Sequence, residues 1–446
     1  MFYQLNEKLS SLIWGPPMLV AFLGVGLYLS ARSGFFQIFH VPTWFRETVL
    51  AAFRDKSVRK SGDGRAISQF QALSAALAAC MGTGNIVGVA TALCAGGPGA
   101  VFWMWLSALL GMMTACAENI LGVQYRYRDK NGEWMGGAMV CMERGLGLKK
   151  TARLFCLFLI LASFGIGNMT QANAISMALR DTWNIVPAAT GIVVAALLGL
   201  VILGGIRRIA SVAQALIPLM SAVFILASFW IIAANIRALP AVLGSICREA
   251  FRWKAAGGGA AGYGMAKAMR YGVARGVFSN EAGLGSSAII HAAADVKRPA
   301  TQGMWGILEV FLDTMLMCTV TALTILCSGS WQPGSALTGA ALSAAAFESQ
   351  MGPFGGVFVS LSVTVFAFAT LIGWSYYGKR GAQYLFGERA AVPYLLLFLC
   401  AAFLGCVTRL DTVWTLSDSF NGLMAVPNLL AVTLLSGKAM QELRMK

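Results

Sequence analysis

The chain has 446 residues, of which 57% are hydrophobic and only 12% are charged. Because soluble domains carry about 25% charged residues, this composition excludes an ordinary soluble domain and predicts a polytopic membrane protein. The net charge of +15 then indicates basic loops at the cytoplasmic face and does not require a nucleic-acid partner. Ten scattered cysteines without a CxxC pair and only two histidines give no signature of a zinc site, an iron–sulfur site or structural disulfides.

Apolar runs of about 17–25 residues mark transmembrane helices. Eleven such runs follow one another along the chain, at roughly 12–31, 66–94, 98–124, 154–178, 187–204, 209–235, 263–292, 299–327, 354–377, 392–408 and 411–436. Between the first two runs, residues 35–60 place Trp44 and Phe45 beside Arg46 and Arg54. That pattern is typical of an amphipathic segment lying in the membrane interface. The predicted fold is therefore all-α with about eleven transmembrane helices.

The connections between the predicted spans differ in their basic content. One alternate set, which starts between the first and second spans, carries 24 of the 34 Lys and Arg residues, whereas the other set carries seven and the seventh span carries three. Since basic loops stay in the cytoplasm, the N-terminus is predicted outside and the C-terminus inside. The connection between spans six and seven holds four of the seven outer basic residues and is the weakest part of this topology.

Two spans are interrupted near their centres. Residues 82–85, Gly-Thr-Gly-Asn, interrupt the second span, and residues 275–281 interrupt the seventh. Unwound backbone at membrane depth is tolerated only where it is buried in protein or lines a wet cavity. One glycine pair could equally serve close helix packing, but two interruptions at matching places favour the binding site of a transporter.

The chain divides into two halves of similar length around these interruptions. We expect one transmembrane domain, in which residues 1–65 form an N-terminal span and an interfacial helix, residues 66–235 form a first repeat and residues 263–436 form a second. Five spans in each half give the halves opposite orientations. This is the inverted-repeat arrangement of secondary transporters, whose sites lie near the bilayer midplane.

The chemistry of a broken helix suggests the kind of ligand. One half-helix offers free N–H groups and the other offers free carbonyls, which attract a carboxylate and a cation or ammonium group respectively. A zwitterionic amino acid needs both. Asn85, Ser279 and Asn280 add polar side chains to the breaks, and Phe278 could supply an apolar wall.

Two further spans are unusually polar. Asn168, Asn173 and Ser375 are interpreted as hydrogen-bonding across helices for stability. Gln171 in the fourth span and Thr370 in the ninth are stronger candidates for the site, because their spans occupy the third place in each repeat.

Charged residues inside spans are functional candidates by default. Arg275 and Glu281 flank the second interruption and are predicted to hold the unwound segment. Asp313 could line an ion path or bond to a neighbouring helix, and Glu118 is assigned to structure.

At these residues the sequence resembles the alanine or glycine:cation symporter family, also called sodium:alanine symporters. The matching runs extend in order over most of the chain, at residues 82–90, 96–100, 136–139, 167–169, 276–283 and 373–378. The resemblance implies a leucine-transporter-like fold with one extra N-terminal span. It also implies sodium-driven import of alanine and glycine through the plasma (inner) membrane of a bacterium, with Na⁺ as coupling ion, no organic cofactor and no enzymatic activity.

The resemblance also implies roles for particular residues. Thr83 and Gly84 would meet the substrate carboxylate, and carbonyls around Gly276 and Val277 would take the ammonium group. The other substrate-binding candidates are Asn85, Gln171, Phe278, Ser279, Asn280, Thr370 and Trp374. Sodium would be held by backbone of Ala78, Met81 and Ala367 and by the Thr370 hydroxyl.

Four alternatives remain at this stage. A proton-coupled carrier could use Glu281 or Asp313, and a sodium-coupled glutamine carrier is possible with the same motifs. A channel would need a continuous pore lining, which central breaks do not favour. An intramembrane enzyme would need a nucleophile with a base, a metal cluster or paired carboxylates, which this sequence does not cluster.

Overall fold

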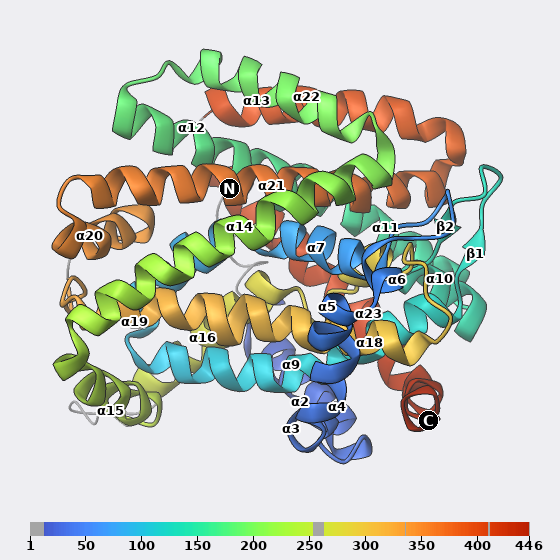
Figure 1. The fold of residues 1–446 in the computed structure, drawn as a ribbon, viewed down its shortest axis with the longest axis horizontal. Helices are drawn as coiled ribbons and strands as arrows, with labels where there is room; N and C mark the ends of the chain where they lie inside the picture. The colour runs from blue at the N-terminus through green and yellow to red at the C-terminus, as the bar shows by residue number, and fades with distance from the viewer. Residues whose placement is uncertain (1–12, 253–262, 335, 409–410, 446) are drawn as a thin grey trace.

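The computed structural model describes residues 13–252, 263–334, 336–408 and 411–445. Most of the long helices run side by side, roughly along the horizontal axis of Figure 1, and short helices and a β-hairpin lie at the two ends of this bundle. Each predicted span that falls on described residues is largely helical, which confirms an all-α membrane fold.

The first half of the chain contains the predicted spans one to six. Its span helices are α2 (Pro16–Arg32), α7 (Gln69–Cys80), η2 (Gly84–Gly88), α8 (Val89–Gly96), α9 (Gly99–Gln124), α11 (Lys149–Phe164), η4 (Gly165–Met169), α12 (Thr170–Trp183), α13 (Pro187–Ile202) and α14 (Gly205–Ala234). The η segments named here are π-helical turns.

The second half contains the predicted spans seven to eleven. Its span helices are α16 (Tyr263–Asn280), α17 (Ser287–His291), α18 (Pro299–Val310), η6 (Phe311–Cys318), α19 (Thr319–Cys327), α21 (Phe354–Phe386), α22 (Ala391–Val407) and α23 (Asp411–Arg444). η6 is also π-helical.

Length and apolar composition identify the membrane-crossing helices. Within the described residues, seven helices meet both criteria, and α7 with η2 and α8 makes an eighth, bent by 52°. α2 and α13 are apolar but shorter, with 17 and 16 residues. Large exposed side chains on α13, α14 and α22, such as Leu200, Leu226 and Leu397, are 61–67% exposed. The protein is therefore a multi-pass membrane protein, and the figure of eleven crossings stays a prediction.

Several short elements join the spans. Residues 36–59 fold into α3 (Phe36–Phe39), α4 (Val41–Phe45), η1 (Arg46–Leu50), α5 (Ala51–Arg54) and α6 (Lys56–Arg59), and the hairpin β1 (Tyr127–Arg128) and β2 (Trp134–Met135) is antiparallel. Two further connecting elements, η5 (Ile236–Ala238) and η7 (Glu388–Ala390), are 3-10 turns. The remaining short helices are α10 (Ala138–Val140), η3 (Cys141–Gly145), α15 (Leu239–Ala250) and α20 (Gly339–Met351).

α15 and α20 were not predicted, and both pack on the membrane-crossing bundle. The Trp103 indole of α9 donates to the Ala250 carbonyl of α15 at 3.1 Å. The Ser343 hydroxyl of α20 donates to the Ile86 carbonyl of η2 at 3.2 Å. α20 therefore covers the second half of the broken span, next to the site described below.

Local sequence explains where the first broken span begins. The Ser68 hydroxyl accepts from the Gln71 N–H at 3.1 Å, and the Gln71 side chain accepts from the Ser68 N–H at 3.0 Å. This capping box satisfies two N–H groups at the start of α7. Pro218 in α14 and Pro427 in α23 lie inside helices, as membrane helices permit when neighbours satisfy the freed carbonyls.

Candidate functional site

The second predicted span breaks where the sequence predicts it. α7 ends at Cys80, and the Gly82 N–H donates to the Cys80 carbonyl at 2.9 Å. A continued α-helix would instead pair this N–H with the Ala78 carbonyl. The chain then enters the π-helical segment η2. Both the carbonyl end of α7 and the N–H groups near Thr83 and Gly84 thereby leave the regular α-helical pattern.

The break in the seventh span lies later than predicted. α16 continues to Asn280, so the proposed interruption at 275–281 is wrong in position, and the non-helical segment is 281–286. Glu281, Gly283 and Gly285 adopt φ values of 56°, 95° and 76°, which end the helix. The Val277 carbonyl accepts from the Glu281 N–H at 2.9 Å. This carbonyl, which the resemblance assigned to the substrate ammonium, is therefore already paired.

The two broken spans contact each other at two levels. A Cβ atom on Gly84 would lie 3.4 Å from both Phe278 Cδ1 and Ser279 Cα, so glycine allows the two backbones to approach closely. Farther along both spans, Ile67 N–H donates to the Ala293 carbonyl at 3.1 Å, and Asp295 N–H donates to the Ile67 carbonyl at 2.7 Å. This isolated parallel bridge joins the start of α7 to the end of the seventh span.

A small cavity lies between the breaks and the neighbouring helices α12, α21 and α23. The predicted site residues that line it are Gly82, Gly84, Gln171, Phe278, Thr370 and Trp374. Its other lining residues are Ala79, Cys80, Ile166, Glu281 and Asn421. The volume open to the centre of a water-sized molecule is ≈ 20 Å³, slightly more than the roughly 10–15 Å³ that one water needs. The walls therefore enclose space for a very small solute.

The remaining predicted substrate residues are buried beside the cavity and do not line it. Thr83, Asn85, Ser279 and Asn280 are all at most 2% exposed. The Thr83 N–H donates to Gln171 Oε1 at 3.5 Å, so Gln171 pairs with an N–H group of the break. Gly276 is part of α16 and packs against α9, because a Cβ atom on it would come within 2.6 Å of Ser107 Oγ.

The candidate sodium ligands lie where α7 meets α21. Ala78, Met81 and Ala367 are buried, and the Thr370 hydroxyl donates to the Phe366 carbonyl at 3.2 Å. Because that hydroxyl uses its proton on its own helix, its lone pairs are left to face a cation. A Cβ atom on Gly82 would lie 2.4 Å from Thr370 Oγ1, so the broken end of α7 is directly against this hydroxyl.

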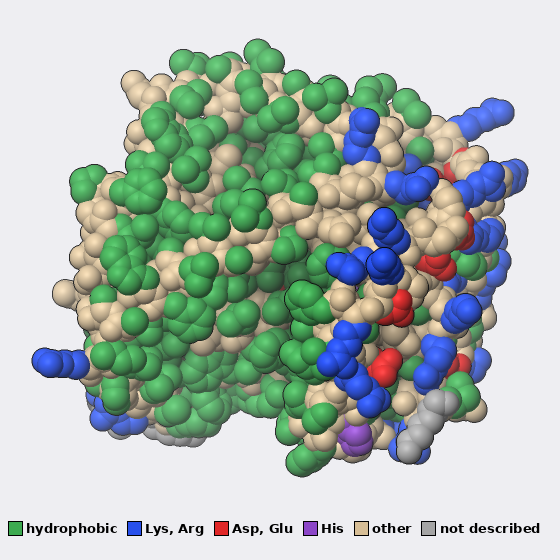
Figure 2. All heavy atoms as spheres, in the orientation of Figure 1, with side chains coloured by type: hydrophobic (Ala, Val, Ile, Leu, Met, Phe, Trp, Pro, Cys, Tyr) green, Lys and Arg blue, Asp and Glu red, His purple; other side chains and the backbone are tan. Residues whose placement is uncertain are grey.

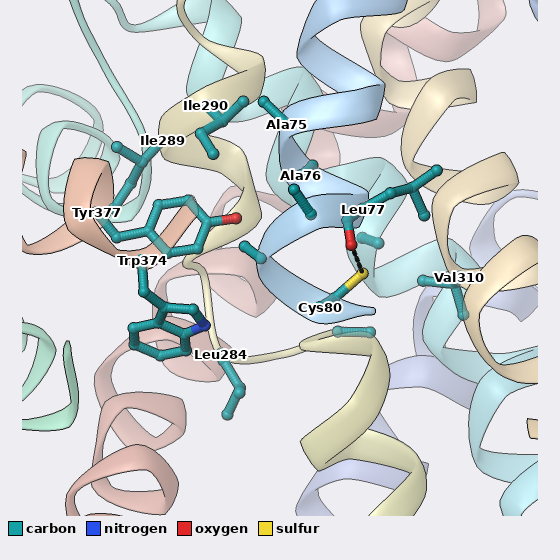
Figure 3. Packing of buried hydrophobic residues seen from close by; sticks show 14 of the residues in the cluster. Ala75, Ala76, Leu77, Cys80, Leu284, Ile289, Ile290, Val310, Trp374 and Tyr377 are labelled. Carbon is teal, nitrogen blue, oxygen red and sulfur yellow. Dashed lines mark hydrogen bonds between the residues drawn. The ribbon is translucent and has the colours of Figure 1, made fainter. Parts of the chain in front are cut away.

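Trp374 closes one side of the cavity. Its indole packs edge-on against Tyr377, with ring centroids 5.5 Å apart. Figure 3 shows both rings across from the last turn of α7, where Cys80 donates to the Leu77 carbonyl. A Cβ atom on Gly167 would come within 2.4–2.5 Å of three Trp374 atoms. Gly167 thus makes room for the aromatic wall that the resemblance assigned to Trp374.

A buried polar network joins the two breaks to the eighth span. The Asn85 amide donates to Asp313 Oδ1 at 2.7 Å and to the Asp313 carbonyl at 3.1 Å. Thr314 donates to Asp313 Oδ2 at 2.7 Å and accepts from Asn280 at 3.0 Å. Asp313 therefore bonds to a neighbouring helix, which is one of the two roles predicted for it. Its partner there is Asn85, the last residue of the Gly-Thr-Gly-Asn motif.

Three π-helical segments surround this region, and the sequence did not reveal them. η2 carries Asn85, η4 carries Gly167 and η6 carries Asp313. A π-helical turn widens the helix by an extra residue and is frequent at functional sites. Composition alone gives no signal for it, because the same residues could continue an α-helix.

Other ionisable side chains make contacts around the cavity. Glu281 accepts from Ser286 within the non-helical segment, and the Arg275 guanidinium lies 5.2 Å from the Phe278 ring centroid. Glu118 accepts from Asn428. The contacts of Glu281 and Glu118 agree with the roles predicted for them, whereas the contact of Arg275 is with Phe278 inside α16 and not with the non-helical segment.

A histidine missed in the sequence lies near the second break. His291, fully buried, is 2.9 Å from Glu309 Oε2, and its other ring nitrogen contacts Gln302.

Two discontinuous helices that meet around a small buried cavity define a secondary transporter with the leucine-transporter fold. Solved structures support this fold. MhsT in complex with L-phenylalanine matches with a TM-score of 0.59 and 13% identity, over 86% of this chain and 97% of that one. A Na⁺-coupled sialic acid symporter matches with a TM-score of 0.57 and 13% identity, over 96% and 98% of the two chains.

The sequence comparisons identify the family. The chain belongs to the sodium:alanine symporter family, whose model matches residues 1–445. It is 43% identical to the sodium/alanine symporter AgcS of Methanococcus maripaludis, over 99% of this chain and 96% of the relative. An uncharacterized transporter of Haemophilus influenzae is 45% identical over 96% and 92%. The probable sodium/glutamine symporter GlnT of Bacillus subtilis is 36% identical over 96% and 87%. The protein is thus a transporter and not an enzyme.

Proposed function

We propose that the chain is a sodium-coupled symporter that imports alanine and glycine by alternating access. The observation that carries this proposal is the cavity between the two breaks. The first break contributes Gly82 and Gly84 to the lining, and Glu281 and Asn421 contribute polar side chains with acceptor oxygens. A carboxylate suits the backbone N–H groups of a helix break, and an ammonium group suits the acceptor oxygens.

The size of the cavity favours small substrates. Gly82 and Gly84 line it without side chains, while Ile166, Phe278 and Trp374 give it apolar walls. Because alanine is larger than one water molecule, these walls must move apart to admit it, and a larger substrate would displace the side chains further, which packed interiors resist. Glutamine is therefore the second candidate substrate, since one relative is a probable sodium/glutamine symporter.

Sodium would act as a cosubstrate at the contact of α7 with α21. Backbone oxygens of Ala78, Met81 and Ala367 with the Thr370 hydroxyl would form the ligand set. Binding there would fix the end of α7 and so complete the N–H side of the substrate site. Coupling of this kind is reciprocal, so each ligand raises the affinity for the other. Rocking of one group of helices against the rest would then expose the site to each side in turn.

The surface charge supports the proposed orientation. Figure 2 shows Lys and Arg gathered at one end of the face in view, over α5, α6 and the β1–β2 hairpin, beside a broad hydrophobic band. We propose that this end and the C-terminus face the cytoplasm of a bacterial cell and that the N-terminus lies outside.

The test is initial uptake of labelled alanine into proteoliposomes that contain the purified protein. We expect uptake with an inward sodium gradient, competition by excess glycine and no uptake when potassium replaces sodium. Uptake driven by a pH gradient without sodium would transfer the coupling role to buried acids such as Asp313. Sodium-driven uptake of glutamine but not alanine would establish the second candidate.

A further inference from the structure

Asn421 on α23 lines the cavity although no motif in the sequence singled it out. The side chain is 1% exposed and shares the cavity wall with Glu281, Phe278 and Trp374. Asn428 lies two turns later on the same helix face and donates to the Gly283 carbonyl in the second break at 2.9 Å. That face of α23 therefore follows the break and brings Asn421 into the lining of the cavity.

The amide oxygen of Asn421 needs a hydrogen-bond donor. Oδ1 is buried and has no hydrogen-bond partner among the residues that the structure describes. Buried polar atoms without a partner are costly and call for a specific explanation. Because the oxygen borders a cavity at the proposed substrate site, a donor on the substrate supplies that explanation.

The substrate group that fits is the α-ammonium. It carries three N–H donors and needs acceptors, and the Val277 carbonyl that the resemblance offered is already bonded to Glu281 N–H. The Glu281 side chain also lines the cavity and adds a second carbonyl-type acceptor. The carboxylate of the substrate belongs near the backbone N–H groups of the first break.

We propose that Asn421 Oδ1 accepts a hydrogen bond from the α-ammonium group of the transported amino acid, which makes α23 a fifth wall of the substrate site. This inference rests on the proposed amino-acid transport and adds a binding residue to it. Its ligand is a primary ammonium, so N-methylated amino acids should bind less well because they lose donors.

The experiment compares alanine with N,N-dimethylalanine in sodium-driven proteoliposomes. Asn421→Leu keeps the size of the side chain and removes the acceptor. Loss of a hydrogen bond to a charged group should raise the KM for alanine roughly 10- to 100-fold. The preference for alanine over N,N-dimethylalanine, measured as inhibition of labelled alanine uptake, should fall by a similar factor. Asn421→Asp keeps an oxygen in place and should retain the preference.

Asn119→Leu is the matched control. Asn119 on α9 is equally buried, and neither of its amide atoms has a partner within the described part of the chain, yet it does not line the cavity. The control should leave the preference for alanine unchanged. Size-exclusion profiles check that each variant is folded, and Asn421→Ala replaces Asn421→Leu if the latter aggregates.

The outcomes separate this inference from the proposed function. A wild-type protein that fails to transport alanine under any gradient would overturn the proposed function. A wild-type protein that transports alanine, with an unchanged preference in Asn421→Leu and Asn421→Ala, would overturn only the role of Asn421. A preference lost equally in Asn119→Leu would also overturn it, since the effect would then follow from a buried polar group in general.

Discussion

The contact between Gly82 and Thr370 gives the sharpest test of where the substrate binds. In Gly82→Ala the new methyl carbon would lie 2.4 Å from Thr370 Oγ1 and 3.3 Å from Gln171 Oε1. Ordinary contacts begin near 3.4 Å, so the Thr370 hydroxyl must move by about 1 Å and lose its bond to the Phe366 carbonyl. The methyl also intrudes on a cavity of ≈ 20 Å³.

The expected magnitude follows from overpacking. Extra methyl groups in a well-packed interior cost about 1–3 kcal/mol, which corresponds to about a 5- to 150-fold loss of affinity if the strain falls on the bound state. The assay is the KM for sodium-driven alanine uptake, with thermal stability in detergent measured in parallel. Gly24→Ala is the control, because a Cβ atom on Gly24 of α2 would have nothing within 4 Å.

A second substitution checks the cause. Thr370→Ala removes the atom that the new methyl would strike, so Gly82→Ala/Thr370→Ala should regain the thermal stability of Thr370→Ala alone. The double variant should nevertheless lack normal sodium dependence, because the proposed ion ligand is missing. An unchanged KM in Gly82→Ala, or no recovery of stability in the double variant, would show that the contact between Gly82 and Thr370 does not constrain the site.

Three further substitutions test the proposed sodium ligand, the aromatic wall of the cavity and a buried pair of salt bridges. Thr370→Ala should raise the sodium concentration for half-maximal uptake while Thr370→Ser stays near wild type, and an unaltered sodium curve in Thr370→Ala would exclude the hydroxyl as an ion ligand. Gly167→Ala should abolish most alanine uptake by displacing Trp374, whose atoms would lie within 2.4–2.5 Å of the new methyl; wild-type uptake rates would contradict this. Arg380, 1% exposed, pairs with Asp129 at 3.0 Å and Glu133 at 2.6 Å. Breaking a buried pair costs about 3–5 kcal/mol, so Arg380→Met should lower the melting temperature by several degrees, whereas Arg153→Met on the exposed side of α11 should not; equal melting temperatures would show that the pairs contribute little.

Much of the fold was predictable because the membrane imposes it. Apolar runs have to be helices where no water can satisfy the backbone, so the spans were visible in the sequence. α15, α20 and the β1–β2 hairpin were not, because they lie in the connections, where this constraint is absent. Arg380 was counted among the basic residues of a connection, and only the fold brings it against Asp129 and Glu133.

The site was predictable in part. Gly82, Gly84, Gln171, Phe278, Thr370 and Trp374 do line one cavity, and glycines and polar residues inside apolar runs pointed to them. The break after Asn280 was misplaced by several residues, because Arg275 and Glu281 looked like its limits while three positive φ values from Glu281 onward actually form it. Asn421 is a polar residue inside an apolar run, so the signal existed, but only the packing of α23 against the second break shows that its side chain reaches the cavity.

Concentrative uptake of alanine shows whether transport is coupled to the sodium gradient. Proteoliposomes loaded with unlabelled alanine at the external concentration are given an inward sodium gradient, and the internal alanine concentration is followed over time. We expect alanine to accumulate above the external concentration and the accumulation to collapse when a sodium ionophore dissipates the gradient. Internal alanine that never exceeds the external concentration would contradict sodium-coupled symport and leave a facilitator of the same fold.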